Sequence, residues 1–178
     1  MFNMSVHQTA SAATNLHVRD SMPSVHTFNV FADYFQFVVQ DEESKDDFAS
    51  IWTEEALSFQ TAFGKSAVCA GTLRNVEVPV EIVVEESDPL ISLGDVDHAV
   101  EGSIEVPSGR LVVMGCTEYF PDAPRLHVQP GTYRALAVMT GVGSIQNEWD
   151  PANDKYTVYL WPGSAKQPKL LKHWKADA

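Results

Sequence analysis

The side chains Asp95, Asp97 and His98 form the densest group in this sequence that could carry metal chemistry. In an extended segment the two aspartates would share one side, and carboxylates with imidazole are common metal ligands. One hypothesis is therefore a metal-dependent, cupin-like enzyme centred on these three residues. The alternative is a turn whose aspartates accept hydrogen bonds from backbone amides. Because the other histidines are scattered, we expect no metal and no other cofactor.

A second group consists of aromatic residues beside turn-forming residues, namely Tyr119, Trp149 and Trp161. Aromatic rings at the mouth of a β-sandwich form contact surfaces for carbohydrates or other small ligands. The hypothesis is a small-ligand or carbohydrate-binding sandwich that uses these three rings around one pocket. The alternative is that the rings pack in the core or anchor loops.

The third group is acidic and lies between residues 41 and 55. Its members are Asp41, Glu42, Glu43, Asp46, Asp47, Glu54 and Glu55. Residues 28–101 hold 16 acids and 3 bases, a net charge of −13, within a chain whose net charge is −12. Such a field attracts basic partners and repels nucleic acid and anionic membranes. The hypothesis is a surface that binds a basic protein; the alternative is a solvated loop that serves solubility.

Other function classes lack their sequence patterns. There is no Gly-x-Ser-x-Gly elbow and no phosphate-binding loop, so no catalytic residue is predicted. The chain has no secretory start and no run of 18 apolar residues, from which we expect a cytoplasmic protein without a membrane span. Cys69 and Cys116 are expected to be buried free thiols. The oligomeric state stays open.

The elements that must position these residues are mostly strands. Residues 28–40 (FNVFADYFQFVVQ) are rich in aromatic and β-branched residues and predict the first strand, with a bend or bulge at Asp33. One helix is predicted from a Thr53 cap to Gly64. Further strands, separated by Gly, Pro, Asn or Asp, are predicted over residues 67–73, 76–85, 98–106, 110–117, 126–128, 131–140 and 155–161.

This pattern predicts a mainly β fold class. Short strands at regular spacing favour an antiparallel two-sheet β-sandwich or jelly roll of about eight strands, with one helix near the N-terminus. We predict a disordered N-terminal arm over residues 1–27, a single sandwich domain over residues 28–165 and a basic C-terminal tail over residues 166–178.

Three short stretches resemble the competence protein J family, whose members inhibit the DNA-entry nuclease. They are Tyr34-Phe35-Gln36-Phe37 with Gln40, Trp52-Thr53-Glu54-Glu55-Ala56, and Pro130-Gly131-Thr132-Tyr133. The resemblance covers about residues 30–140. The sequence is also similar to related uncharacterised bacterial proteins with the same aromatic strand, Trp-Thr-acid-acid helix start and Pro107-Ser108-Gly109-Arg110-Leu111 turn. The family resemblance implies a non-enzymatic, inhibitor or immunity-like protein whose acidic residues bind a basic partner such as a nuclease. The longer chain, with its neutral start and basic end, departs from the family pattern.

Overall fold

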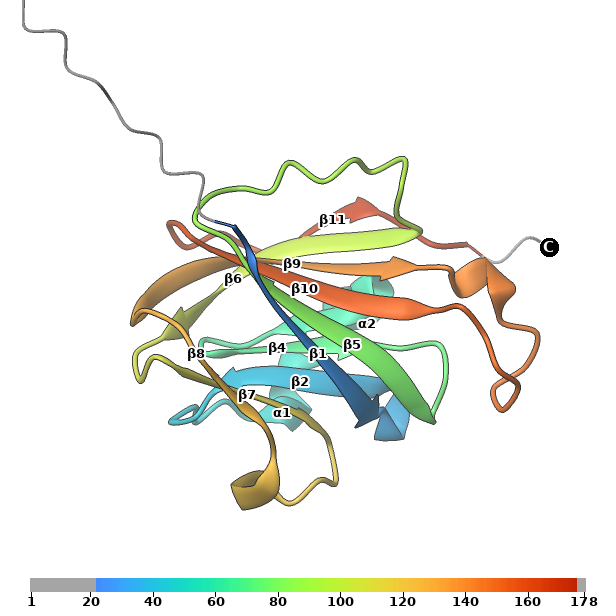
Figure 1. The fold of residues 1–178 in the computed structure, drawn as a ribbon, viewed down its shortest axis with the longest axis horizontal. Coiled ribbons are helices and arrows are strands. Elements are labelled where there is room, and N and C mark those ends of the chain that lie inside the picture. The colour runs from blue at the N-terminus through green and yellow to red at the C-terminus, as the bar shows by residue number, and fades with distance from the viewer. Residues whose placement is uncertain (1–21, 176–178) are drawn as a thin grey trace, which may run out of the picture.

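The computed structural model describes residues 22–175, which form two facing sheets (Figure 1). One sheet has six strands in the order β1-β5-β10-β9-β6-β11, and the other has five in the order β3-β4-β2-β7-β8. The strands are β1 Ser24–Phe31, β2 Gln36–Asp41, β3 Thr61–Phe63, β4 Ala67–Gly71, β5 Glu77–Val84, β6 His98–Val106, β7 Arg110–Gly115, β8 Arg125–His127, β9 Gly131–Thr140, β10 Lys155–Pro162 and β11 Lys169–Lys172. The α-helices are α1 Phe48–Ile51 and α2 Glu54–Phe59, and 3-10 turns span Asp33–Phe35, Phe120–Asp122 and Val142–Ser144.

The predicted mainly β fold class, a sandwich of two sheets, is confirmed. The pairings are antiparallel except that of β5 with β10, which run parallel in the middle of the six-stranded sheet. The structure has eleven strands in the described residues rather than about eight, because short strands were missed and one predicted strand is two.

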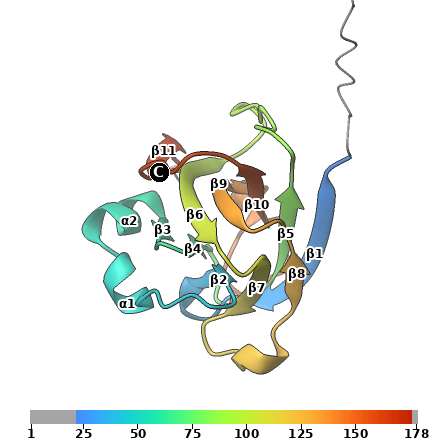
Figure 2. The same ribbon diagram turned by 90° about the vertical axis from the view of Figure 1, so that its left-hand side faces the viewer.

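Apolar side chains fill three layers, so the central strands are apolar on both faces. Phe37 and Val39 of β2 point into the large cluster between the sheets, whereas Val38 between them faces outward. That outer face is covered by the two short helices, which Figure 2 shows on the side of the five-stranded sheet away from β1 and β5. A third cluster on the other outer face contains Leu136 and Trp161.

The predicted strand over residues 28–40 is wrong in one respect: it is two strands in opposite sheets. β1 pairs with β5, the chain turns through the 3-10 segment Asp33–Phe35, and β2 then pairs with β4 and β7. The bend expected at Asp33 is confirmed, since its carboxylate accepts the Cys116 amide at 2.6 Å. This crossing links the two sheets and turns Tyr34 and Phe35 outward.

The predicted helix is α2, which is shorter than predicted, and a second short helix, α1, precedes it. Thr53 caps α2 as expected, its hydroxyl accepting the Ala56 amide at 3.2 Å. The helix ends at Gln60 in the left-handed region, not at Gly64, because the chain returns at once as β3. None of the helices within residues 22–175 is long and apolar enough to span a membrane.

Both predicted terminal segments are partly strand. Residues 24–27, assigned to the arm, belong to β1, and the part of the arm before residue 22 lies outside the described residues. Within the predicted basic tail, β11 pairs with β6, and Lys172 donates to the carbonyls of Leu93 and Val96. The tail is therefore an edge strand over part of its length, held because its lysine satisfies loop carbonyls.

The two cysteines differ in exposure. Cys69 on β4 is buried, which raises the pKa of its thiol to about 12, as expected of an inert core thiol. Cys116 is also a free thiol, but it is exposed just after β7, so its predicted burial is wrong. The strand ends at Gly115, two residues before its predicted end, so Cys116 lies in the turn that follows it.

A buried charge network joins the sheets at one end of the sandwich. Arg74, between β4 and β5, donates two hydrogen bonds to Asp154 just before β10, at 3.1 and 2.5 Å. The Tyr156 hydroxyl donates to the same carboxylate and accepts the Leu73 amide, each at 3.0 Å. The Tyr156 ring meets Phe37 of the facing sheet edge to face at 6.4 Å.

His98 ties the end of α2 to the C-terminal segment. Its buried ring donates from Nε2 to the Phe59 carbonyl at 2.8 Å and accepts the Trp174 amide at Nδ1 at 3.1 Å. Both bonds together require the neutral ring. Burial is the main cause that lowers the pKa of His98, and the nearby His173 adds to it.

The first prediction concerns the buried charge pair. Asp154→Asn leaves the Arg74 guanidinium without its counter-charge in a dry site, so we expect a loss of about 3–5 kcal/mol in the free energy of unfolding. Urea denaturation measures it, with Asp95→Asn on an exposed loop as the matched control. Equal stability of the two variants would contradict a structural role for the pair.

The second prediction concerns pH. Folding lowers the pKa of His98, so the unfolded chain binds a proton more readily than the folded one. The contribution of neutral His98 to the free energy of unfolding is therefore fully present above about pH 6.5, and it declines as the pH falls below that value. His98→Gln keeps a neutral donor and acceptor and should reduce the slope of the urea midpoint between about pH 7 and pH 5. If the urea midpoint of His98→Gln changes with pH as steeply as that of the wild type, other titratable groups cause the loss of stability.

Candidate partner-binding surface

The acidic segment from Asp41 to Glu55 runs from the end of β2 through α1 to the first turn of α2. The structure divides its seven carboxylates into those that hold the fold together and those that face solvent. The inward carboxylates are those that have backbone amides or arginines within hydrogen-bond distance.

Asp41 is not part of an exposed surface, so its assignment to a partner-binding set is wrong. Its side chain is 0% exposed. One carboxylate oxygen accepts the amide and hydroxyl of Ser108 at 3.0 and 2.7 Å, and the other accepts the Glu43 amide at 2.9 Å. It therefore fixes the β6–β7 turn against the end of β2.

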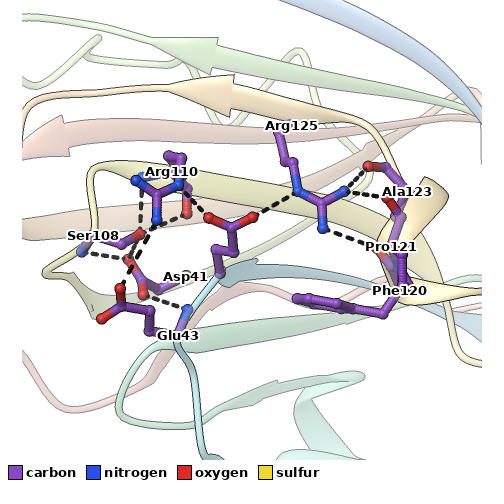
Figure 3. A network of polar contacts seen from close by, with 9 residues as sticks. Asp41, Glu43, Ser108, Arg110, Phe120, Pro121, Ala123 and Arg125 are labelled. Carbon is purple, nitrogen blue, oxygen red and sulfur yellow. Dashed lines mark hydrogen bonds and ion pairs between the residues drawn. The ribbon is translucent and has the colours of Figure 1, made fainter.

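Two arginines, Arg110 and Arg125, both labelled in Figure 3, neutralise Glu42. Its carboxylate accepts hydrogen bonds from Arg110 and, at 2.9 Å, from Arg125. These two guanidinium groups, Arg110 foremost, lower the pKa of Glu42. Arg125 also donates to three carbonyl groups of the β7–β8 loop, so Glu42 helps to hold that loop rather than presenting free charge.

Asp46 also serves the fold. Its two carboxylate oxygens accept the amides of Lys65 and Ser66 at 2.9 and 2.7 Å, closing the turn between β3 and β4. A Cβ on Gly64 would lie 2.5 Å from this carboxylate, so glycine is needed there. Its neighbour Asp47 caps α1 through the Ala49 amide but remains exposed.

Four carboxylates of the segment remain on the surface. They are Glu43, Asp47, Glu54 and Glu55. Glu43 has only a long approach of 3.9 Å to Arg110, and the other three make no ion pair within residues 22–175. The one lysine of the segment, Lys45, is exposed and forms no ion pair within residues 22–175, so the segment from Asp41 to Glu55 keeps an excess of negative charge. We call these four residues the acidic surface.

A hollow of about 290 Å³ lies between the 3-10 turn after β1 and helix α2, whose first turn carries Glu54 and Glu55 of the acidic surface. We call it the aromatic groove; it is lined by Tyr34, Phe35, Gln36, Trp52, Leu57, Gln60, Gly71, Thr72 and Leu73. Tyr34 is 73% exposed and Leu57 61% exposed, which is unusual for large apolar side chains gathered in one place. No charged residue lines it.

The sequence interpretation missed this groove because it treated Tyr34 and Phe35 as alternate faces of one strand. A signal was present, since a strand over residues 28–40 exceeds the usual length of 3–10 residues. Ala32 and Asp33 interrupt its apolar pattern at the observed crossing.

The three rings of the ligand-binding hypothesis do not share a pocket. Trp161 is 5% exposed and packs in the outer cluster of the six-stranded sheet. Trp149 is exposed on the loop that precedes β10, so about 20 Å of strand separates that loop from Trp161. Tyr119 lies on an exposed loop after β7 of the other sheet. The hypothesis of one shared pocket is wrong because the three rings lie on different elements of the fold, one of them buried.

The metal hypothesis also fails on the positions of its ligands. His98 uses both ring nitrogens for backbone hydrogen bonds, and Asp97 accepts the Val142 amide at 3.0 Å. Asp95 lies exposed on the preceding loop. Across residues 22–175 no group of three or more His, Cys, Asp or Glu side chains is arranged to hold a metal ion.

The comparisons with known proteins agree with this geometry at the level of fold. No protein-family model matches the sequence, and no curated protein matches it significantly. The structure is similar to that of ComJ from Bacillus subtilis, an inhibitor of the DNA degrading activity of NucA, with a TM-score of 0.62 and 14% identity over 80% of this chain and 100% of that one. It is also similar to the protein of crocagin biosynthetic gene J, with a TM-score of 0.57 and 20% identity over 81% of this chain and 100% of that one. The resemblance noted in the sequence is thus confirmed as a shared fold.

Proposed function

We propose that this protein is a non-enzymatic, protein-binding inhibitor whose acidic surface covers the basic DNA-binding groove of a nuclease. The observation that carries the proposal is the exposed negative charge of Asp47, Glu54 and Glu55, which form no ion pair within residues 22–175, together with Glu43, which is paired with Arg110 only at 3.9 Å. The fold shared with ComJ supports it, because that protein inhibits a nuclease.

The physical basis is electrostatic mimicry of DNA. A nuclease holds its substrate through phosphate contacts from lysine and arginine, so a rigid surface of carboxylates competes for the same groove. Opposite potentials raise the rate of encounter, and salt screens them. Figure 2 shows α1 and α2 on the outside of the five-stranded sheet; because Asp47 caps α1 and Glu54 and Glu55 form the first turn of α2, these three carboxylates are well placed for this role.

The third prediction tests this function by nuclease inhibition. The assay follows DNA degradation by NucA and by the purified DNA-degrading nucleases of the source organism, with ComJ as the reference inhibitor of NucA. We expect inhibition at about 50 mM salt that weakens markedly at about 300 mM. The double variant Glu54→Lys/Glu55→Lys should lower the association rate at least about 10-fold.

The matched control is Glu86→Lys/Asp88→Lys, which makes the same charge change on the exposed β5–β6 loop. If no nuclease is inhibited at low salt, the proposal is wrong. Equal effects of the two double variants would show that net charge, and not the acidic surface, governs binding.

A further inference from the structure

The aromatic groove is built to be rigid although its aromatic rim is exposed. Tyr34, Phe35 and Gln60 all have φ between 53° and 59°, a region that costs non-glycine residues about 1 kcal/mol or more each. The surrounding bonds hold them there: the Phe35 amide donates to the Ala32 carbonyl at 3.1 Å, and the Thr72 amide donates to the Phe35 carbonyl at 2.8 Å. Tyr34 and Phe35 are therefore fixed outward.

The walls of the groove are equally constrained. The Trp52 indole donates to the Gln36 amide oxygen at 2.8 Å, which sets the plane of its ring. The Gly71 amide donates to the Gln60 carbonyl at 2.8 Å, and a Cβ on Gly71 would lie 2.6 Å from that oxygen. The close approach joins β4 to the end of α2, so the hollow exists before any partner arrives and binding loses little conformational entropy.

Charge at the rim points to the kind of occupant. Glu54 lies three residues before Leu57 on α2, and residues three apart are neighbours on one helix face. Neither lysine nor arginine lines the groove. A bound segment therefore meets an apolar hollow flanked by negative charge.

We propose that the aromatic groove receives one apolar side chain, such as Phe or Leu, from a segment of the partner in which basic residues flank it. This inference rests on the proposed function and adds to it an apolar anchor inside an electrostatic interface. Exposed aromatic and aliphatic side chains beside a hollow of about 290 Å³ match the central anchor sites of protein interfaces.

A second copy of this chain is a poorer occupant. A two-fold interface centred on the groove would bring Glu54 and Glu55 towards their own counterparts, and like charges oppose such pairing. A basic segment has no such penalty.

The fourth prediction uses a peptide probe, so that it does not depend on knowing the nuclease. The probe is an acetylated, amidated Lys-Lys-Phe-Lys-Lys peptide, compared with the same peptide carrying Ala at its centre. NMR amide shifts of the protein should map the Phe peptide to Phe35, Leu57 and Thr72, with a dissociation constant about 10-fold lower than that of the Ala peptide.

Leu57→Ser should remove most of that difference, whereas Leu90→Ser, which changes an even more exposed leucine on the β5–β6 loop, should leave it unchanged. Tyr34→Ser is the second groove variant, and the exposure of both side chains means that folding is preserved. Against a nuclease that the wild type inhibits, Leu57→Ser should raise the dissociation rate without altering its salt dependence.

Equal binding of the Phe and Ala peptides, or shifts that map away from the groove, would overturn the inference. Concentration-dependent dimerisation with shifts at the groove in the absence of peptide would overturn it in favour of a second copy. If the peptide result holds and no nuclease is inhibited, the proposed function fails while the groove remains a site for a basic segment of another protein.

Discussion

The buried pair between Arg74 and Asp154 determines how the two sheets meet. Arg74 lies on the connection that leaves the five-stranded sheet, and Asp154 precedes a central strand of the other. Because the carboxylate also receives the Tyr156 hydroxyl, and that hydroxyl accepts the Leu73 amide, the network positions the chain from Thr72 to Arg74. The same stretch forms one wall of the aromatic groove, so the exposed site depends on a charge pair that water does not reach.

Acidic residues in this protein have two separate roles that a count of charges cannot distinguish. Asp41, Glu42 and Asp46 accept backbone amides or arginines and would be needed in a protein that binds nothing. Glu54 and Glu55 lie in the first turn of α2, where they stabilise the helix by a favourable interaction with its dipole. They also expose negative charge to solvent. The density of carboxylates between residues 41 and 55 thus overstates the size of the surface available to a partner.

The sequence predicted strands well where turn residues bracket them. β6 and β9 begin and end at the predicted residues, because Pro107 and Gly109 follow β6 and Pro130 and Gly141 flank β9. The sequence-based prediction failed where contacts between distant residues determine the local structure. A left-handed turn at Tyr34 and Phe35 has no local signal as strong as an Asn-Gly pair, and β11 forms only because β6 offers an edge. Burial of Asp41 depends on Ser108, a residue far along the chain.

The parallel pairing of β5 with β10 has a consequence for the order in which the protein acquires its shape. Val80 lies beside Tyr156, so the middle of the six-stranded sheet cannot close until almost the whole chain is present. Sheets dominated by such distant pairings fold over about milliseconds to seconds, since a large loop must close first. Residues 34–73 emerge early during synthesis, but Asp154 and Tyr156 come late. The aromatic groove therefore takes its final shape only after residues 154–156 have been made, and a shorter chain exposes aromatic side chains that have not yet been fixed in place.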